Sequence, residues 1–312
     1  MYFIDFFKRM TRKSNIPVLI YLILNVFVIA GIVFMFFGGE SLPFWEALLI
    51  GVGLYAISLV IALSPFGEWI LRLQIGCKKI KRAEQIQFLK PLFQEVYGRA
   101  KEFDPAVPDD VQLFINNDKE PNAFATGRKT ICLTEGMLHM PEEQIKATLA
   151  HEFGHLAHRD TDLILVVSVG NLIVSAMIIG IRIFIDILHL FMGLVALAFG
   201  GDDAIVGTVA NILYHALLTA VVAGLVWLWT KIGTMLVMKS SRENEYEADA
   251  FAFDLGYGNE LCEMLDSLEP SHAKGLFATL ESSHPDKDDR IAYLQECGAT
   301  YRAFYGHSQF NG

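Results

Sequence analysis

The stretch AHEFGHL, residues 150–156, holds two histidines four positions apart with a glutamate directly after the first. Residues four apart lie on one face of a helix, so His151 and His155 can point both imidazoles at one ion. Glu152 can then accept a proton from a zinc-activated water. The alternative is a chance match in an ordinary helix, but the chain has only nine histidines in 312 residues. We interpret the stretch as a catalytic zinc site with one Zn²⁺ per chain.

A catalytic zinc site needs a third protein ligand and keeps one position open. His158 lies one turn further along the helix, with its Cα about 10 Å from that of His151, so we expect it to miss the ion. A distant carboxylate is the better candidate. Three glutamates in the stretch ENEYE compete for this role, and their spacing alone does not choose: Glu243, Glu245 and Glu247.

The elements around this motif predict a mainly α-helical fold with a small antiparallel β-sheet. Pro141 suits the start of a helix that carries the motif, and two glutamates follow it where the helix dipole favours acids. Residues 83–101 have the apolar spacing of an amphipathic helix. Three short strand-like runs separated by turns lie between these helices, at 111–115, 123–126 and 130–133.

Two segments near the N-terminus are long and apolar enough to cross a bilayer. Residues 16–37 contain no charge, and residues 44–63 contain one early glutamate. Each can span a hydrocarbon core of about 30 Å, so we expect an uncleaved helical hairpin. Basic residues precede the first segment and follow the second, while the turn between them has none. The positive-inside rule therefore places both outer flanks in the cytoplasm.

Two more apolar blocks follow the motif, at about 163–181 and 204–229. The stretch between them, 181–203, is apolar but carries Arg182, Asp186 and His189. Its periodicity fits a third crossing, an interfacial helix or an extension of the neighbouring spans.

Composition excludes other classes of function. The chain has a mean hydropathy of +0.38 and a net charge of −10, and it lacks a broad basic face, so we expect no nucleic-acid partner. The four cysteines are scattered without a C-x-x-C pair, which argues against a thiolate metal site and fits free, mostly buried thiols.

Three motifs together resemble the membrane zinc metalloproteases of the HtpX type, the family that includes the CAAX prenyl proteases. They are AHEFGHLAHRD, NEYEADAFA and SHPDKDDR. The resemblance covers nearly the whole chain, and four spans favour HtpX over the CAAX proteases, which have seven. The long, charge-broken stretch 181–203 departs from the pattern.

The resemblance implies roles for further residues. Glu245 becomes the third zinc ligand, and Asp249, four positions on, becomes the carboxylate that orients a ligand histidine. His284 would stabilise the oxyanion of the tetrahedral intermediate, and Arg290 would fix the local geometry. The stretch Asn122, Ala123, Phe124 and Ala125 is similar to the family's edge strand, which would pair with an extended peptide substrate. The simpler alternatives are a solvated acidic helix, a helix-entry histidine and a plain hairpin strand.

The zinc chemistry constrains the membrane topology. Both histidines and Glu245 must lie on the same side of the membrane, so the number of crossings between residues 160 and 240 must be even. Residues 181–203 are therefore not a separate full crossing. We expect a membrane hairpin (1–66), a cytoplasmic part with the zinc helix and sheet (67–160), a second hairpin (161–230) and a cytoplasmic part with the third ligand (231–312).

These features predict a zinc-dependent endopeptidase in the bacterial inner membrane, with its catalytic domain and both termini in the cytoplasm. Its partners would be the lipid bilayer and polypeptide substrates, and the resemblance implies misfolded or damaged membrane proteins and a role in their quality control. A narrow-specificity processing protease and an inactive scaffold of the same fold are the alternatives. An intact Glu152 argues against the scaffold.

Overall fold

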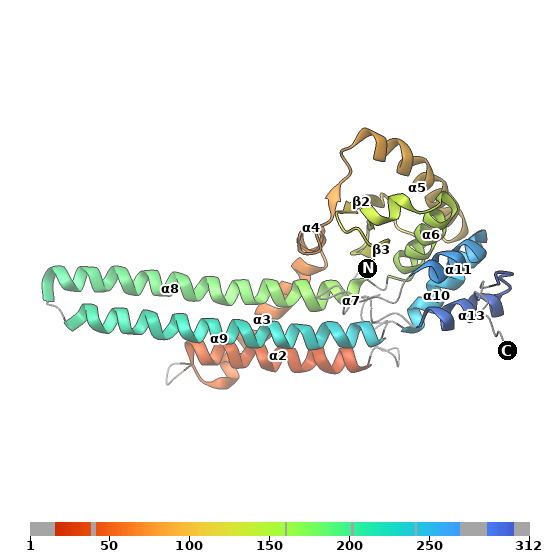
Figure 1. Ribbon diagram of the computed structural model, residues 1–312. Helices are drawn as coiled ribbons and strands as arrows, with labels where there is room; N and C mark the ends of the chain where they lie inside the picture. The colour runs from red at the N-terminus through yellow and green to blue at the C-terminus, as the bar shows by residue number, and fades with distance from the viewer. Residues whose placement is uncertain are drawn as a thin grey trace, which may run out of the picture. The chain divides into compact units, whose positions relative to one another are not determined.

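The computed structural model describes residues 16–38, 42–159, 161–200, 203–240, 242–268 and 286–302. The chain divides into two compact units, each built from two separate segments. The helical unit contains residues 1–67 and 164–236, and the mixed unit contains residues 68–163 and 237–312. Residues 164–236 of the helical unit thus separate the two segments of the mixed unit. Mainly helical structure with one small sheet confirms the predicted fold class (Figure 1).

The helical unit is built from long apolar helices. They are α2 (Ile16–Phe37), α3 (Phe44–Ala62), α8 (Gly170–Gly200) and α9 (Asp203–Ser240), with a π-helical turn η3 (Leu165–Val169) before α8. A short helix α7 (Asp162–Ile164) crosses the boundary between the mixed unit and the helical unit. Four stretches are long and apolar enough to cross a membrane, as predicted: Ile16–Phe37, Phe44–Ala62, Asp162–Val195 and Ile212–Val237.

The predicted limits of the second pair of spans are too short for the helices. The charged stretch after residue 181 continues α8 without a break to Gly200, and α9 begins at Asp203. The charges do not end the helix because Arg182 is buried and pairs with Asp186, one turn further on, at 2.8 Å. Among the described residues between 170 and 240, the chain therefore forms two long helices, and residues 181–200 belong to the first of them.

A closed network of neutral polar side chains joins α2, α8 and α9. We call it the polar membrane cluster, and it comprises Tyr21, Asn25, Asn171, Trp229 and Thr230. The Asn25 amide donates to Asn171 Oδ1 at 2.8 Å and accepts from the Trp229 indole at 2.8 Å. The Asn171 amide donates to the Tyr21 hydroxyl at 2.8 Å and to Thr230 Oγ1 at 3.1 Å. The Tyr21 hydroxyl donates to the Trp229 carbonyl at 3.1 Å, so each amide, indole and phenol group has a partner.

The mixed unit surrounds helix α6 (Glu142–His158), which is buried from Ala147 to Ala157. Its other helices are α5 (Ala83–Phe103), α10 (Arg242–Ala252), α11 (Gly258–Ser267) and α13 (Lys287–Cys297), with a π-helical turn η4 (Phe253–Tyr257). Helix α4 (Pro65–Gln74) leads into the unit, and a 3₁₀ turn η2 (Glu135–His139) precedes α6. Phe153 of α6 stacks on Tyr97 of α5, with ring centroids 5.3 Å apart. Aromatic packing of this kind fixes α6 in the core.

The small sheet is mixed, which corrects the prediction of an antiparallel one. Its strands are β1 (Lys78–Lys79), β2 (Gln112–Asn116), β3 (Ala123–Thr126) and β4 (Thr130–Thr134), in the order β1-β2-β4-β3. Strand β4 pairs antiparallel with β3 and parallel with β2. All five β4 side chains are buried, so β4 takes the position between the other two. Strand β3 is left at the edge of the sheet.

Candidate metal centre

Helix α6 places the histidines of the H-E-x-x-H motif in the core of the mixed unit. Glu142 and Glu143 stand in its first turn, as expected from the helix dipole, and the helix ends where Arg159 takes a left-handed conformation. His151, Glu152 and His155 are all buried, which is unusual for ionisable side chains without a partner or a metal.

A glycine inside the motif allows a second helix to approach. A Cβ at Gly154 would lie only 2.9 Å from the Cα of Ala248 on α10, so a larger residue would push the two helices apart. Glycine in a helix interior otherwise lowers stability. Sequence reasoning gave Gly154 no role, although a glycine at this interior position was a readable signal.

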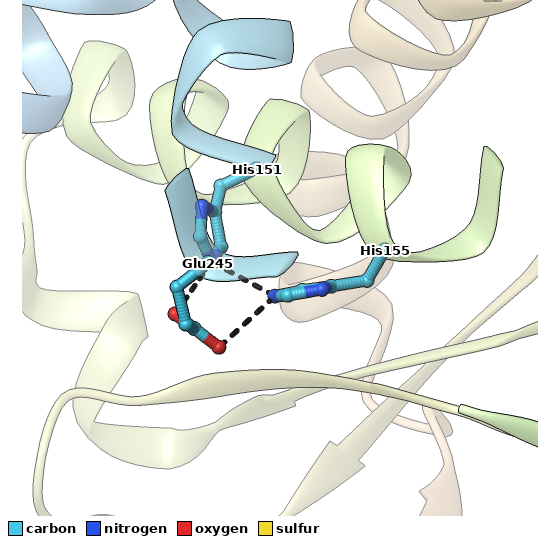
Figure 2. Close-up of side chains that lie close together, drawn as sticks. All are labelled: His151, His155 and Glu245. Carbon is cyan, nitrogen blue, oxygen red and sulfur yellow. Dashed lines mark hydrogen bonds and ion pairs between the residues drawn. The ribbon is translucent and has the colours of Figure 1, made fainter. Parts of the chain in front are cut away.

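The approach of α10 brings Glu245 to the two histidines (Figure 2). The Nε2 atoms of His151 and His155 are 3.1 Å apart. Glu245 Oε2 lies 3.6 Å from His151 Nε2, and Glu245 Oε1 lies 3.4 Å from His155 Nε2. Glu247 is exposed, and His158 is not part of this group. Of the side chains that the structure describes, Glu245 is thus the glutamate of ENEYE that faces the histidines.

The spacing of these atoms fits a zinc ion. Zinc bonds of about 2.0–2.1 Å in tetrahedral geometry place neighbouring ligand atoms about 3.3 Å apart. The two Nε2 atoms are 3.1 Å apart, and each has one of the two Glu245 oxygens at 3.6 or 3.4 Å, so both imidazoles and the carboxylate can reach one ion. Two imidazole nitrogens and a carboxylate are also a donor set that zinc favours.

Asp249 and Arg290 surround the cluster from α10 and α13. Arg290 holds Asp249 with two hydrogen bonds, from Nε to Oδ2 at 2.8 Å and from Nη2 to Oδ1 at 2.6 Å. Asp249 Oδ1 also lies 2.9 Å from His151 Nδ1. We assign the Nδ1 proton of His151 to this contact, which leaves Nε2 available as a ligand. Asp249 is completely buried, and Arg290 supplies the charge that permits its burial.

The pKa values of these groups show which charges the site favours. Burial alone would raise the pKa of Asp249, but Arg290 and the His151 hydrogen bond hold it below its usual value. Burial and Arg290 act to lower the pKa of His151, yet the hydrogen bonds to Asp249 and Glu245 outweigh them and raise it. The arrangement therefore favours a positive charge at the His151 imidazole, which a proton or a metal ion can supply.

The edge strand β3 lies against the same motif. The backbone N–H of Ala125 donates to Glu152 Oε2 at 2.5 Å. Ala123 and Phe124 lie on the same strand, which pairs with β4 on its other side. Asn122 precedes the strand, where its backbone is bonded to Thr134. His284, the expected oxyanion residue, lies outside the described residues.

Comparison with known proteins identifies the family of the chain. The model of peptidase family M48 matches residues 89–297, which is more than half of the chain. The chain belongs to peptidase family M48. M48 peptidases depend on a metal ion, typically zinc. Together with the four apolar helices, membership makes the protein a membrane protease and confirms the resemblance to the HtpX type.

Two HtpX proteases are similar to this chain along most of their own length. A protease HtpX homolog of Ralstonia pickettii is 27% identical over 280 residues, which cover 78% of this chain and 87% of that protein. Protease HtpX of Stenotrophomonas maltophilia is 25% identical and covers 87% of this chain and 94% of that protein. A crystal structure of S. mikatae Ste24p is 21% identical with a TM-score of 0.40, over 91% of this chain and 66% of that one.

Proposed function

We propose that the protein is a zinc-dependent endopeptidase that acts on polypeptides at the inner membrane of a bacterium. The single observation that carries the proposal is the convergence of His151, His155 and Glu245, whose ligand atoms all lie within 4.8 Å of one another. When bound there, zinc supplies Lewis-acid activation of the scissile carbonyl and of water.

The residues of the chain then have distinct tasks. His151 and His155 from α6 and Glu245 from α10 hold the ion. Asp249 fixes the orientation of the His151 ring through Nδ1, and Arg290 holds Asp249.

Glu152 is the proposed general base. It accepts a proton from the attacking water and passes it to the leaving amine, since both transfers occur beside the ligand histidines. His284 remains the proposed oxyanion donor, on the basis of the family resemblance alone.

The substrate is proposed to bind as an added strand along β3. An edge strand offers backbone N–H and C=O groups to an extended peptide and reads its conformation more than its side chains. The Ala125 N–H of β3 donates to Glu152, on the side of the strand away from β4. A peptide paired along this edge would therefore lie next to the proposed base. Such backbone recognition suits unfolded chains, which supports misfolded membrane proteins as substrates and a role in quality control.

The proposed topology places the mixed unit, which contains the C-terminus, in the cytoplasm, and the first pair of spans brings the N-terminus to the same side. The mixed unit contains both halves of the metal site, while the chain between them lies in the helical unit. An even number of crossings is the arrangement that this connection requires. Basic residues beyond the first pair of spans support the cytoplasmic side.

The test is Glu152→Gln in the full-length protein, with metal analysis of the same sample. We expect hydrolysis of an unfolded membrane protein to fall by about 10²–10⁴-fold while one zinc per chain is retained, because the amide cannot accept the proton. Glu142→Gln, on the exposed first turn of the same helix, is the matched control. Cleavage at the wild-type rate by Glu152→Gln would rule out the mechanism.

The same assay separates the alternatives. Cleavage of several unrelated unfolded proteins by the wild type supports a quality-control protease, while cleavage of only one supports a processing protease. Full zinc content without any cleavage supports an inactive scaffold.

A further inference from the structure

Helix α4 begins where a proposed membrane span ends. Helix α3 ends at Ala62 and α4 starts at Pro65, so the chain connection alone keeps α4 close to the bilayer surface. The ten residues of α4, PFGEWILRLQ, are too few to cross a membrane and too apolar on one side for a simple linker.

The two faces of α4 differ in exposure. Phe66, Trp69 and Leu73 are spaced by three and four residues, which puts them on one face, and they are 56%, 47% and 59% exposed. On the opposite face Leu71 and Glu68 are buried. Aromatic and aliphatic side chains that form one stripe beside a membrane span are typical of helices at the boundary between lipid headgroups and acyl chains.

A basic segment follows this stripe directly. Residues 75–83 contain four cations and no acid, and all four cationic side chains are exposed: Lys78, Lys79, Lys81 and Arg82. Clusters of this kind next to a membrane span are attracted to anionic lipid headgroups. The chemistry of the two neighbouring features therefore points to the same partner, an anionic phospholipid surface.

The buried face of α4 holds the turn between β3 and β4. Glu68 Oε1 accepts hydrogen bonds from the Lys129 N–H at 3.1 Å and from Thr130 Oγ1 at 2.7 Å. Arg72 donates to Thr130 Oγ1 at 3.0 Å. A Cβ at Gly127 would lie 2.4 Å from Glu68 Cγ, so the glycine permits this close approach. The turn is thus built around a side chain of α4.

A second contact ties the same turn to the start of the third apolar span. Arg128 makes two hydrogen bonds with Asp162, at 3.0 and 3.2 Å, and the Thr161 hydroxyl donates to the Gly127 carbonyl. Asp162 is the first residue of that span. The turn that follows β3 is therefore hydrogen-bonded to Glu68, which follows the second span, and to Asp162, which begins the third. Strand β3 itself contacts Glu152 through the Ala125 N–H.

We propose that α4 lies in the headgroup region of an anionic phospholipid leaflet, with Phe66, Trp69 and Leu73 in lipid, and that Glu68 thereby holds the β3 edge at a fixed depth beside the bilayer. A chain drawn out of the membrane would then meet the β3 edge as it leaves the lipid. The lipid contact stands on the geometry of α4 alone, whereas the second half rests on the proposed protease function.

The lipid contact is tested with nitroxide labels in the full-length protein, reconstituted in vesicles of phosphatidylcholine and phosphatidylglycerol. The labels are placed at Leu73→Cys and, as a control on the flank of the same helix, at Gln74→Cys, each with Cys297→Ser. We expect the label at 73 to collide mainly with oxygen, which partitions into lipid, and the label at 74 to collide with a water-soluble nickel chelate. Equal access of the nickel chelate to both labels overturns the proposal, whether or not the protein is a protease.

The positioning role is tested by comparing two substrates of the variant Phe66→Ser/Trp69→Ser/Leu73→Ser. We expect cleavage of a bilayer-embedded protein to fall about tenfold or more, because misplacement of a reacting group by a small distance is costly, while cleavage of a short soluble peptide stays at the wild-type rate. An equal loss on both substrates shows that the stripe only supports folding and overturns the positioning role, and so does no loss on either. A wild type that cleaves neither substrate refutes the proposed function and leaves the label experiment unaffected.

Discussion

The mixed unit and the helical unit both bury polar side chains. The metal cluster of the mixed unit, by which we mean His151, His155 and Glu245, contains a carboxylate, whereas the polar membrane cluster of the helical unit is neutral. In the polar membrane cluster every oxygen acceptor among the side chains of Asn25, Asn171 and Tyr21 faces a donor. In the metal cluster, two imidazole nitrogens and a carboxylate face one another within 4.8 Å.

This difference indicates what each cluster is for. A network in which each donor meets an acceptor gains nothing from a ligand and instead fixes the packing of helices, as polar groups in a membrane interior do. Two imidazole nitrogens and a carboxylate that converge on one point form a site for a shared cation. Burial of polar residues alone therefore does not mark a site, whereas the convergence of acceptors does.

The largest expected effect comes from breaking that convergence with Glu245→Ala. We expect zinc to be lost on dialysis and hydrolysis to fall about a thousandfold or more, because the ion supplies several kcal/mol of transition-state stabilisation. Zinc content by elemental analysis and peptide hydrolysis measure the two effects. Glu247→Ala, at an exposed position two residues on, is the control, and loss of zinc in this control instead would assign the ligand to Glu247.

The next largest effect is expected from the ion pair between Asp249 and Arg290, which lies beside His151. Asp249→Ala removes the carboxylate that accepts two hydrogen bonds from buried Arg290 and leaves the longer contact with Glu245 at 3.4 Å, so we expect the free energy of unfolding of the mixed unit to fall by about 3–5 kcal/mol. Hydrolysis should fall about 10–100-fold, since His151 loses the partner of its Nδ1. Thermal unfolding in detergent and activity at saturating zinc measure these changes. An Asp249→Ala protein as stable as the wild type would show that this ion pair contributes nothing.

A smaller effect is expected from the polar membrane cluster. Asn171→Leu leaves Asn25 and Tyr21 without one partner each, and helix packing should weaken by about 1–2 kcal/mol, with little change in zinc content. Unfolding in detergent followed by tryptophan fluorescence reports the loss. The double variant with Asn25→Leu should lose less than the sum of the single variants, because the two amides share a hydrogen bond. Strict additivity would contradict a connected network.

The smallest effect is expected at an ion pair on the surface. Glu95 of α5 lies 2.9 Å from Lys146 of α6, and the hydrogen bond to Lys146 lowers the pKa of Glu95 below 4.5. Its contribution is therefore present above pH 4.5 and is lost as the pH falls through the lowered pKa. Because Glu95 is partly exposed, we expect Glu95→Gln to cost less than about 1 kcal/mol at neutral pH. Unfolding midpoints at neutral and acidic pH test this, and a loss as large as that of Asp249→Ala would contradict the contrast between buried and exposed charges.

The sequence by itself determined the features that depend on local spacing. Helical periodicity put His151 and His155 on one face, and uninterrupted apolar length predicted the four long helices. The family resemblance named Glu245, and peptidase family M48 confirms that resemblance. Strand positions were also close, since β3 begins and ends where its pattern predicts.

Only the tertiary structure decided which distant elements meet. Nothing in local spacing shows that β4 lies between β2 and β3, because that order depends on which strand is buried on both faces. The continuation of α8 beyond residue 181 depends on the pairing of Arg182 with Asp186, which offsets the cost of the charge. The approach of α10 to α6 requires the space that Gly154 leaves. Contacts of this kind join residues far apart in the chain, and packing selects them.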